Sequence, residues 1–166
     1  TKELNLFSKR NNLFLIVFFT ILFLIQTEVS ATKLVISINK NIHHLIVDLA
    51  LTEEEKKRGL MFVEELQNTN GMLFIYKKPR VLKMWMKNTK IDLDIIFINE
   101  NNLISSIKKG LKLSRKIISS DFPVLAVLEI PSSCNDKMKL KKGDKIEWKR
   151  INDLIKVSPS LFPCIS

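Results

Sequence analysis

Three short apolar segments between Gly71 and Asn99 constrain the fold of this chain more than any other feature. Each has the length and the β-branched or aromatic content of a strand, and turn residues such as Pro79 separate them. The segments are Met72 to Tyr76, Leu82 to Met86 and Leu93 to Ile98. Three strands packed so closely along the sequence predict that a β-sheet forms the centre of the molecule.

Further segments of the same kind lie on both sides of this run. Leu34 to Ile38 and Leu45 to Ala50 are joined by a polar turn, which predicts a hairpin. The other expected strands are Leu103 to Ile107, Val124 to Ile130 and Lys145 to Trp148.

Two short helices complete the pattern. Thr52 and Glu55 have the spacing of a capping box, and Gly59 is placed to end the helix that this box begins. A second helix is expected from Ser133 to Leu140. The sequence therefore predicts an α+β fold, a compact and mostly antiparallel β-sheet or partly open barrel with two short helices.

Residues 1–31 have the pattern of a secretory signal peptide. Basic residues precede an apolar run from Leu13 to Ile25, and Val29 and Ala31 are small residues at the positions that a signal peptidase recognises. A retained membrane anchor is the alternative, but the run is shorter than the ~20 residues that span a bilayer. We therefore expect cleavage after Ala31, export to the periplasm or the extracellular space, and no membrane span after cleavage.

The remaining chain has the size of one domain with a single core. We expect this domain at residues 32–150, followed by a C-terminal tail at residues 151–166. The formal net charge of +10 favours anionic partners such as envelope polymers or lipid head groups, although an AT-rich coding sequence would also enrich lysine. Nucleic acid is not an expected partner, because the lysines are scattered and not interleaved with stacking aromatic residues.

An ordered set of short motifs between Leu45 and Trp148 resembles the domain of unknown function 192 family, small bacterial and archaeal proteins without an assigned activity. The motifs are Gly59-Leu60-Met61, Gly71-Met72-Leu73-Phe74, Trp85-Met86-Lys87-Asn88-Thr89, Leu93-Asp94, Phe97, Leu128-Glu129 and Gly143-Asp144. The chain departs from the family pattern at Val63, Asp92 and Ser133, where the family usually has Arg, Pro and Gly. The Val63 departure weakens any anion-binding role for the helix end, and the other two affect loop geometry.

Several polar or charged residues lie inside or beside these apolar motifs, where burial requires pairing or a ligand. The candidate pocket residues are Trp85, Lys87, Asn88, Thr89, Asp94 and Glu129. Two carboxyl groups with a nearby lysine could perform acid–base chemistry. In the alternative, structural interpretation, Asp94 accepts hydrogen bonds from the backbone of the Asn88 loop while Lys87 pairs with Glu129.

Strand alternation gives two sharper expectations. It places Asp94 and Ile96 on one face of their strand, with Leu93, Ile95 and Phe97 on the other. After the first helix, the turn at Gly59 is expected to direct Met61 into the core beside Met72.

No metal or cofactor is predicted. Met84 and Met86 lie two residues apart on one face and could contribute soft ligands to copper, but methionine is also a common filler of small cores. In an oxidising compartment Cys134 and Cys164 could form a disulfide that holds the tail, or both could remain thiols.

Two functions from different classes remain open. The first is a small binding or accessory module of the cell envelope, with a pocket between the Trp85 to Thr89 loop and the Glu129 strand. The second is a small envelope hydrolase or transferase in which Asp94 and Glu129 act as acid and base. Their geometry discriminates between the two, because an acid–base pair must converge on one open cleft.

Overall fold

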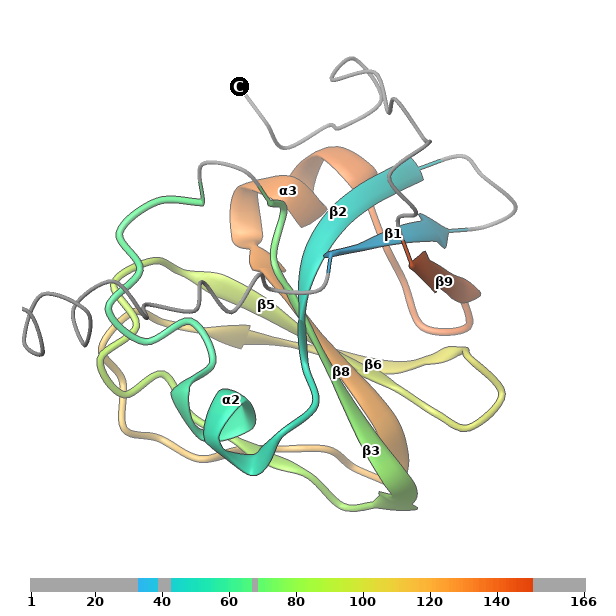
Figure 1. Cartoon of the computed structure of the whole chain (residues 1–166), viewed down its shortest axis with the longest axis horizontal. Helices are drawn as coiled ribbons and strands as arrows, with labels where there is room; N and C mark the ends of the chain where they lie inside the picture. Colours follow the sequence, from blue (N-terminus) through green and yellow to red (C-terminus); the bar gives the residue numbers. More distant parts are fainter. Residues whose placement is uncertain (1–32, 39–42, 67–68, 151–166) are drawn as a thin grey trace, which may run out of the picture. The chain divides into compact units, whose positions relative to one another are not determined.

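The computed structural model describes residues 33–38, 43–66 and 69–150, all of which belong to one compact unit (Figure 1). The expected signal peptide, the expected tail and Cys164 lie outside the described residues. Within the described residues, no helix has the length and apolar character needed to cross a bilayer.

The centre of the fold is a seven-stranded mixed sheet with the strand order β6-β5-β8-β3-β2-β1-β9. Its strands are β1 (Lys33–Ile38), β2 (His43–Ala50), β3 (Met72–Arg80), β5 (Leu93–Ile98), β6 (Ile104–Gly110), β8 (Val124–Pro131) and β9 (Ile146–Arg150). The sheet is not closed into a barrel, although an isolated bridge between Leu103 and Lys145 brings the starts of β6 and β9 together. The predicted α+β class with a mostly antiparallel sheet is confirmed.

One pair of strands departs from the antiparallel pattern. β2 and β3 run parallel, with Asp48 opposite Met72 and Ala50 opposite Phe74. A parallel pair needs a crossover connection, and the long segment between these strands supplies it. This crossover contains helix α2 (Glu53–Arg58) and carries the chain over one face of the sheet.

A second, two-stranded sheet pairs β4 (Lys83–Met84) with β7 (Ile118–Ser119). The expected strand from Leu82 to Met86 is thus shorter than predicted, and β7 has no counterpart among the expected elements. Ser120 extends this pairing, because its hydroxyl accepts a hydrogen bond from the Leu82 amide at 3.0 Å.

The two helices form close to where the sequence predicts them. In α2, the Thr52 hydroxyl accepts from the Glu55 amide at 3.1 Å, and the Glu55 carboxylate accepts from the Thr52 amide at 2.8 Å. This reciprocal capping box begins the helix, and Gly59 ends it with a φ of +48°. The second helix, α3 (Ser132–Met138), follows β8 directly.

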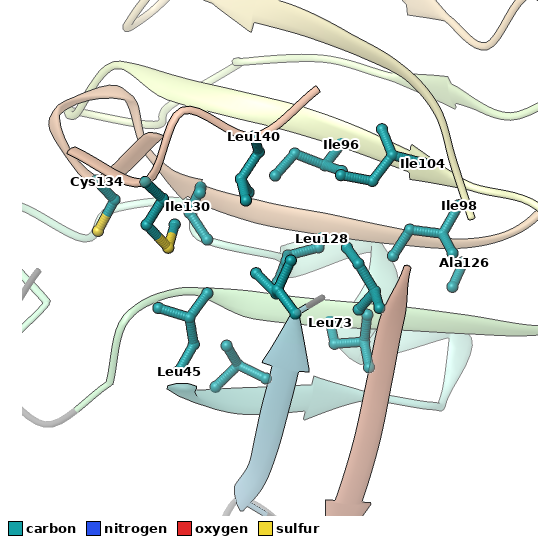
Figure 2. Packing of buried hydrophobic residues seen from close by; sticks show 14 of the residues in the cluster. Leu45, Leu73, Ile96, Ile98, Ile104, Ala126, Leu128, Ile130, Cys134 and Leu140 are labelled. Atoms are coloured by element: carbon teal, nitrogen blue, oxygen red, sulfur yellow. The ribbon is translucent and has the colours of Figure 1, made fainter. Parts of the chain in front are cut away.

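The first hydrophobic cluster fills the face of the sheet that α3 covers (Figure 2). Strands β5 and β8 contribute alternate residues to it, and β2 closes it from the other side with Leu45, Val47 and Leu49. Cys134 and Met138 are the buried residues of α3, so the helix docks onto the sheet through them.

The second cluster lies on the opposite face, beneath α2 and β4. Its largest members are Phe74 and Phe97, and Met84 and Met86 are buried in it as packing residues. Figure 1 shows α2 and α3 on different sides of the strands that separate these clusters. Because both faces of the central strands are buried, β5 is apolar at every position except Asp94.

The prediction that Met61 turns into the core is wrong by one residue. Leu60 is buried at 4% exposure in the second cluster, whereas Met61 is only partly buried. The φ of +48° at Gly59 reverses the chain direction immediately, so the first residue after the glycine faces the sheet. Met61 is of intermediate exposure instead.

Candidate functional site

Glu129 lies near the centre of the sheet, on the strand between β5 and β3. It is paired with Ile95 of β5 on one side and with Met72 of β3 on the other, and it is 4% exposed. A Cβ atom built on Gly59 would lie 3.9 Å from Glu129 Oε2 and 3.3 Å from the Phe74 ring. The glycine therefore lets the end of α2 approach the carboxyl group closely.

Burial controls the charge of this carboxyl group. Removal from water raises the pKa of Glu129 from 4.5 to about 8, since desolvation penalises the charged form. None of the ion pairs formed by the described residues involves Glu129. At neutral pH the group is therefore mostly protonated, and it can donate a hydrogen bond as well as accept one.

A small cavity opens beside the carboxyl group. Its volume is about 20 Å³, which is enough for roughly one water molecule or one small polar group. We call it the Glu129 pocket, and its lining residues are Lys56, Lys57, Arg58, Gly59, Leu60, Met61, Phe74, Met84, Trp85, Thr89 and Glu129. The pocket thus joins the end of α2 to the segment that follows β4.

Two of the other predicted residues also line this pocket. Trp85 is 40% exposed, and Thr89 is buried at 4% exposure. Lys87 does not pair with Glu129 as expected, because its Nζ atom lies over the Trp85 ring, 5.1 Å from the ring centroid. The cation therefore supports the exposed tryptophan and forms no ion pair with Glu129.

The loop that carries these residues is fixed by backbone hydrogen bonds to two distant segments. The Phe62 amide donates to the Asn88 carbonyl at 2.7 Å, and the Leu113 amide donates to the Thr89 carbonyl at 2.8 Å. Phe62, Asn88 and Leu113 all have positive φ, with values of 66°, 60° and 61°. A positive φ costs conformational energy in bulky residues such as phenylalanine and leucine. The hydrogen bonds therefore hold the loop in a strained conformation.

Asp94 lies away from the Glu129 pocket. It is opposite Ile130 of β8, whereas Glu129 is opposite Ile95 of β5. Paired residues on adjacent strands share a face and successive residues alternate, so the two carboxyl groups point to opposite faces. The predicted alternation of Asp94 with its neighbours is confirmed.

The expected partners of Asp94 are wrong. Its carboxylate accepts hydrogen bonds from Ser132 Oγ at 3.0 Å and from Asn135 Nδ2 at 2.7 Å, and both donors belong to the first turns of α3. The donors come from α3 because Asp94 faces the first cluster, while the Asn88 loop lies over the second. Asp94 therefore attaches α3 to β5 and does not contribute to the pocket.

This separation limits the chemistry of the site. The Glu129 carboxyl group, whose pKa is raised, faces the Glu129 pocket. The Asp94 carboxyl group, which paired acid–base catalysis would also require, lies on the opposite face of the sheet. Among the described residues, no group of three or more His, Cys, Asp or Glu side chains is arranged to hold a metal ion. The arrangement suits the binding of a small polar group beside an exposed aromatic ring.

Sequence reasoning missed the contribution of the α2 end to this pocket. Lys57, Arg58 and Leu60 line it, but they were not among the candidate residues. The signal that could have identified them is the Gly59-Leu60-Met61 motif, because a glycine that ends a helix lets its last turn approach a neighbouring strand.

Comparisons with known proteins agree with this fold. Residues 34–148 match the model of the DUF192 family, which is described as uncharacterized. No curated protein matches the chain significantly. The crystal structure of a candidate transcription regulator from Sinorhizobium meliloti is 32% identical, with a TM-score of 0.66, and the match covers 73% of this chain and 97% of that one.

A protein of unknown function from Novosphingobium aromaticivorans is similar to the same extent. Its crystal structure is 33% identical, with a TM-score of 0.65, and the match covers 73% of this chain and 89% of that one. The family match extends from β1 to β9 and so includes every strand that builds the Glu129 pocket. The chain therefore belongs to the DUF192 family.

Proposed function

We propose that the protein is a small, exported binding module of the cell envelope that holds its ligand in the Glu129 pocket. The observation that carries this proposal is the buried Glu129 carboxyl group, which faces a cavity and has no cation paired with it among the described residues. A buried polar group of this kind is costly unless a partner satisfies it. A bound ligand would supply that partner.

The shape of the pocket supports a ligand with two parts. The cavity of about 20 Å³ accommodates only a small polar group, such as a hydroxyl or an amide oxygen. The half-exposed Trp85 ring offers a flat surface beside it for an apolar or sugar-like body. The ligand would insert its polar tip toward Glu129 and rest its body against the tryptophan.

Binding is favoured over hydrolysis by the position of Asp94. An acid and a base that act on one substrate must reach the same atoms, but Asp94 and Glu129 face opposite sides of the sheet. Export is supported by the sequence pattern of residues 1–31 alone.

Native mass spectrometry of the full chain purified from its own envelope fraction would test the proposal. We expect a retained ligand on the wild-type protein, and loss of most of it in Glu129→Gln and Trp85→Ala. Phe122→Ala is the matched control, because Phe122 is a similarly exposed aromatic residue that does not line the pocket. Equal ligand retention in all three variants, or recovery of the protein from the cytoplasm alone, would contradict the proposal.

A further inference from the structure

A second and much larger groove lies on the outer side of α2, next to the projecting end of β3. Its volume is about 830 Å³, within the range of sites that hold drug-sized ligands. We call it the Tyr76 groove, and its lining residues are Leu51, Thr52, Glu53, Lys56, Ile75, Tyr76, Lys77, Lys78 and Arg80. It shares only Lys56 with the Glu129 pocket.

The charge of this groove is strongly positive. Four of its lining residues are cationic, and Glu53 is its single carboxylate. Glu53 Oε1 lies 3.4 Å from Lys56 Nζ, so it compensates the cation that α2 contributes. Among the ion pairs of the described residues, none involves Lys77, Lys78 or Arg80. Three cations therefore remain available to an incoming anion.

An aromatic ring organises the centre of the groove. Lys56 Nζ lies 4.6 Å from the centroid of the Tyr76 ring, and Arg80 Cζ lies 4.8 Å from it. These contacts hold two flexible cations at fixed positions before any ligand arrives, which lowers the entropic cost of binding. Burial raises the pKa of Tyr76, so its hydroxyl group stays uncharged and does not compensate the two cations.

The backbone arranges the other cations in a row. Residues 77 to 80 are exposed, and the register between β3 and β8 shifts between Ile75 and Arg80. Successive side chains of a strand point to opposite faces, so cations that share a face here, such as Lys78 and Arg80, are spaced by roughly 6.6 Å along the strand. A row of uncompensated cations at this spacing is complementary to a chain with repeated negative charges, whereas a single anion would engage only part of it.

We propose that the Tyr76 groove binds a linear polyanion along the end of β3. The negative groups of the polymer contact Lys77, Lys78 and Arg80, and its backbone lies against Tyr76 and Ile75. This site is independent of the ligand proposed for the Glu129 pocket. A polymer is favoured over a membrane surface because the cations line a groove and not a flat face.

Calorimetric titration of the purified full chain with inorganic polyphosphate of defined length tests the proposal. We expect the double variant Lys78→Gln/Arg80→Gln to bind about tenfold more weakly at low salt, and its affinity to depend less steeply on salt. The matched control is Arg115→Gln/Lys116→Gln, which removes the same charge from exposed positions outside the groove. The control should change affinity by less than about twofold.

A second pair of variants separates the ring from the charge. Tyr76→Phe keeps the ring and should bind nearly as well as wild type, while Tyr76→Leu should lose several-fold in affinity. Equal weakening by the groove variant and the control would show a general charge effect and overturn the proposal. So would unchanged binding by the groove variant, or binding to anionic lipid vesicles without binding to polyphosphate.

Discussion

Asp94 and Glu129 lie on neighbouring strands of one sheet, but their carboxyl groups point to opposite faces of it. Asp94 joins α3 to the sheet through two hydrogen bonds, and Glu129 faces a cavity on the other side. Two acidic residues that look alike in the sequence therefore have separable roles. Substitution of the first should affect stability, and substitution of the second should affect ligand binding and pH dependence.

Asp94→Asn should lower the free energy of unfolding by about 1 to 3 kcal/mol, the usual range for a charged hydrogen-bonding partner. Asparagine is uncharged and has one acceptor oxygen, so both bonds lose the assistance of the charge, and its amide nitrogen cannot accept from Asn135 Nδ2. Urea denaturation measures the loss. Ser132→Ala should be less damaging, because only one bond disappears. An Asp94→Asn variant as stable as wild type would disprove the attachment.

Glu129 should give the protein an unusual pH dependence. The pKa of its carboxyl group is 4.5 ordinarily and about 8 in the folded protein, so between these values the folded state holds a proton that the unfolded chain has released. The free energy of unfolding should fall as pH rises from about 4.5 to 8, by up to ~1.4 kcal/mol per pH unit, and then level off. Glu129→Gln should abolish this fall.

Urea denaturation at a series of pH values compares the two proteins. The variant should be more stable than wild type at pH above about 8 and similar to it near pH 4.5. Parallel pH profiles for both proteins would mean that the carboxyl group titrates normally in the folded state.

Gly71→Ala should destabilise the protein by about 3 kcal/mol, because a Cβ atom there would overlap the carbonyl oxygen of Glu129. The overlapping atom belongs to the central strand, which cannot move away without breaking sheet hydrogen bonds. Gly143→Ala is the comparison, since no atom lies within 4 Å of its Cβ position. There the φ of +90° alone should cost about 1 kcal/mol. Thermal denaturation of the two variants should rank them clearly.

Leu113→Asn should stabilise the protein by roughly 0.5 to 1 kcal/mol. Leu113 is 60% exposed, so little apolar contact is lost, and asparagine adopts its φ of 61° more easily. Leu113→Ile should have the opposite effect, because β-branched residues resist positive φ. If the two variants melt at the same temperature, the backbone at this position carries no strain.

We predict that residues 1–31 act as a signal peptide that is cleaved between Ala31 and Thr32, because Val29 and Ala31 fit the recognised positions. N-terminal sequencing of the exported protein checks this directly. A chain that starts well before Thr32 would indicate a retained anchor instead.

Local patterns in the sequence predicted local structure well. The Thr52 and Glu55 capping box forms as expected, and the alternation around Asp94 assigns each β5 residue to the correct face. Both depend on residues a few positions apart, so the sequence contains all the information that they need.

Long-range partners were not predictable in the same way. Asp94 bonds to Asn135, which is 41 residues away, and nothing near Asp94 distinguishes this donor from the nearer Asn88 loop. The error at Met61 has a different origin, because the backbone angles at Gly59 decide which of two adjacent apolar residues turns inward. The parallel pairing of β2 with β3 likewise follows from the crossover and not from the strands themselves.

The floor of the Glu129 pocket belongs to a strand that is hydrogen-bonded on both sides, while much of its wall comes from the end of α2 and the turn after β4. Neither wall segment belongs to the seven-stranded sheet, and the bond from the Phe62 amide to the Asn88 carbonyl joins the two. Selectivity could thus be altered by replacing them as cassettes while the scaffold and its buried acid stay unchanged. The same division would let a protein engineer graft new recognition onto this fold.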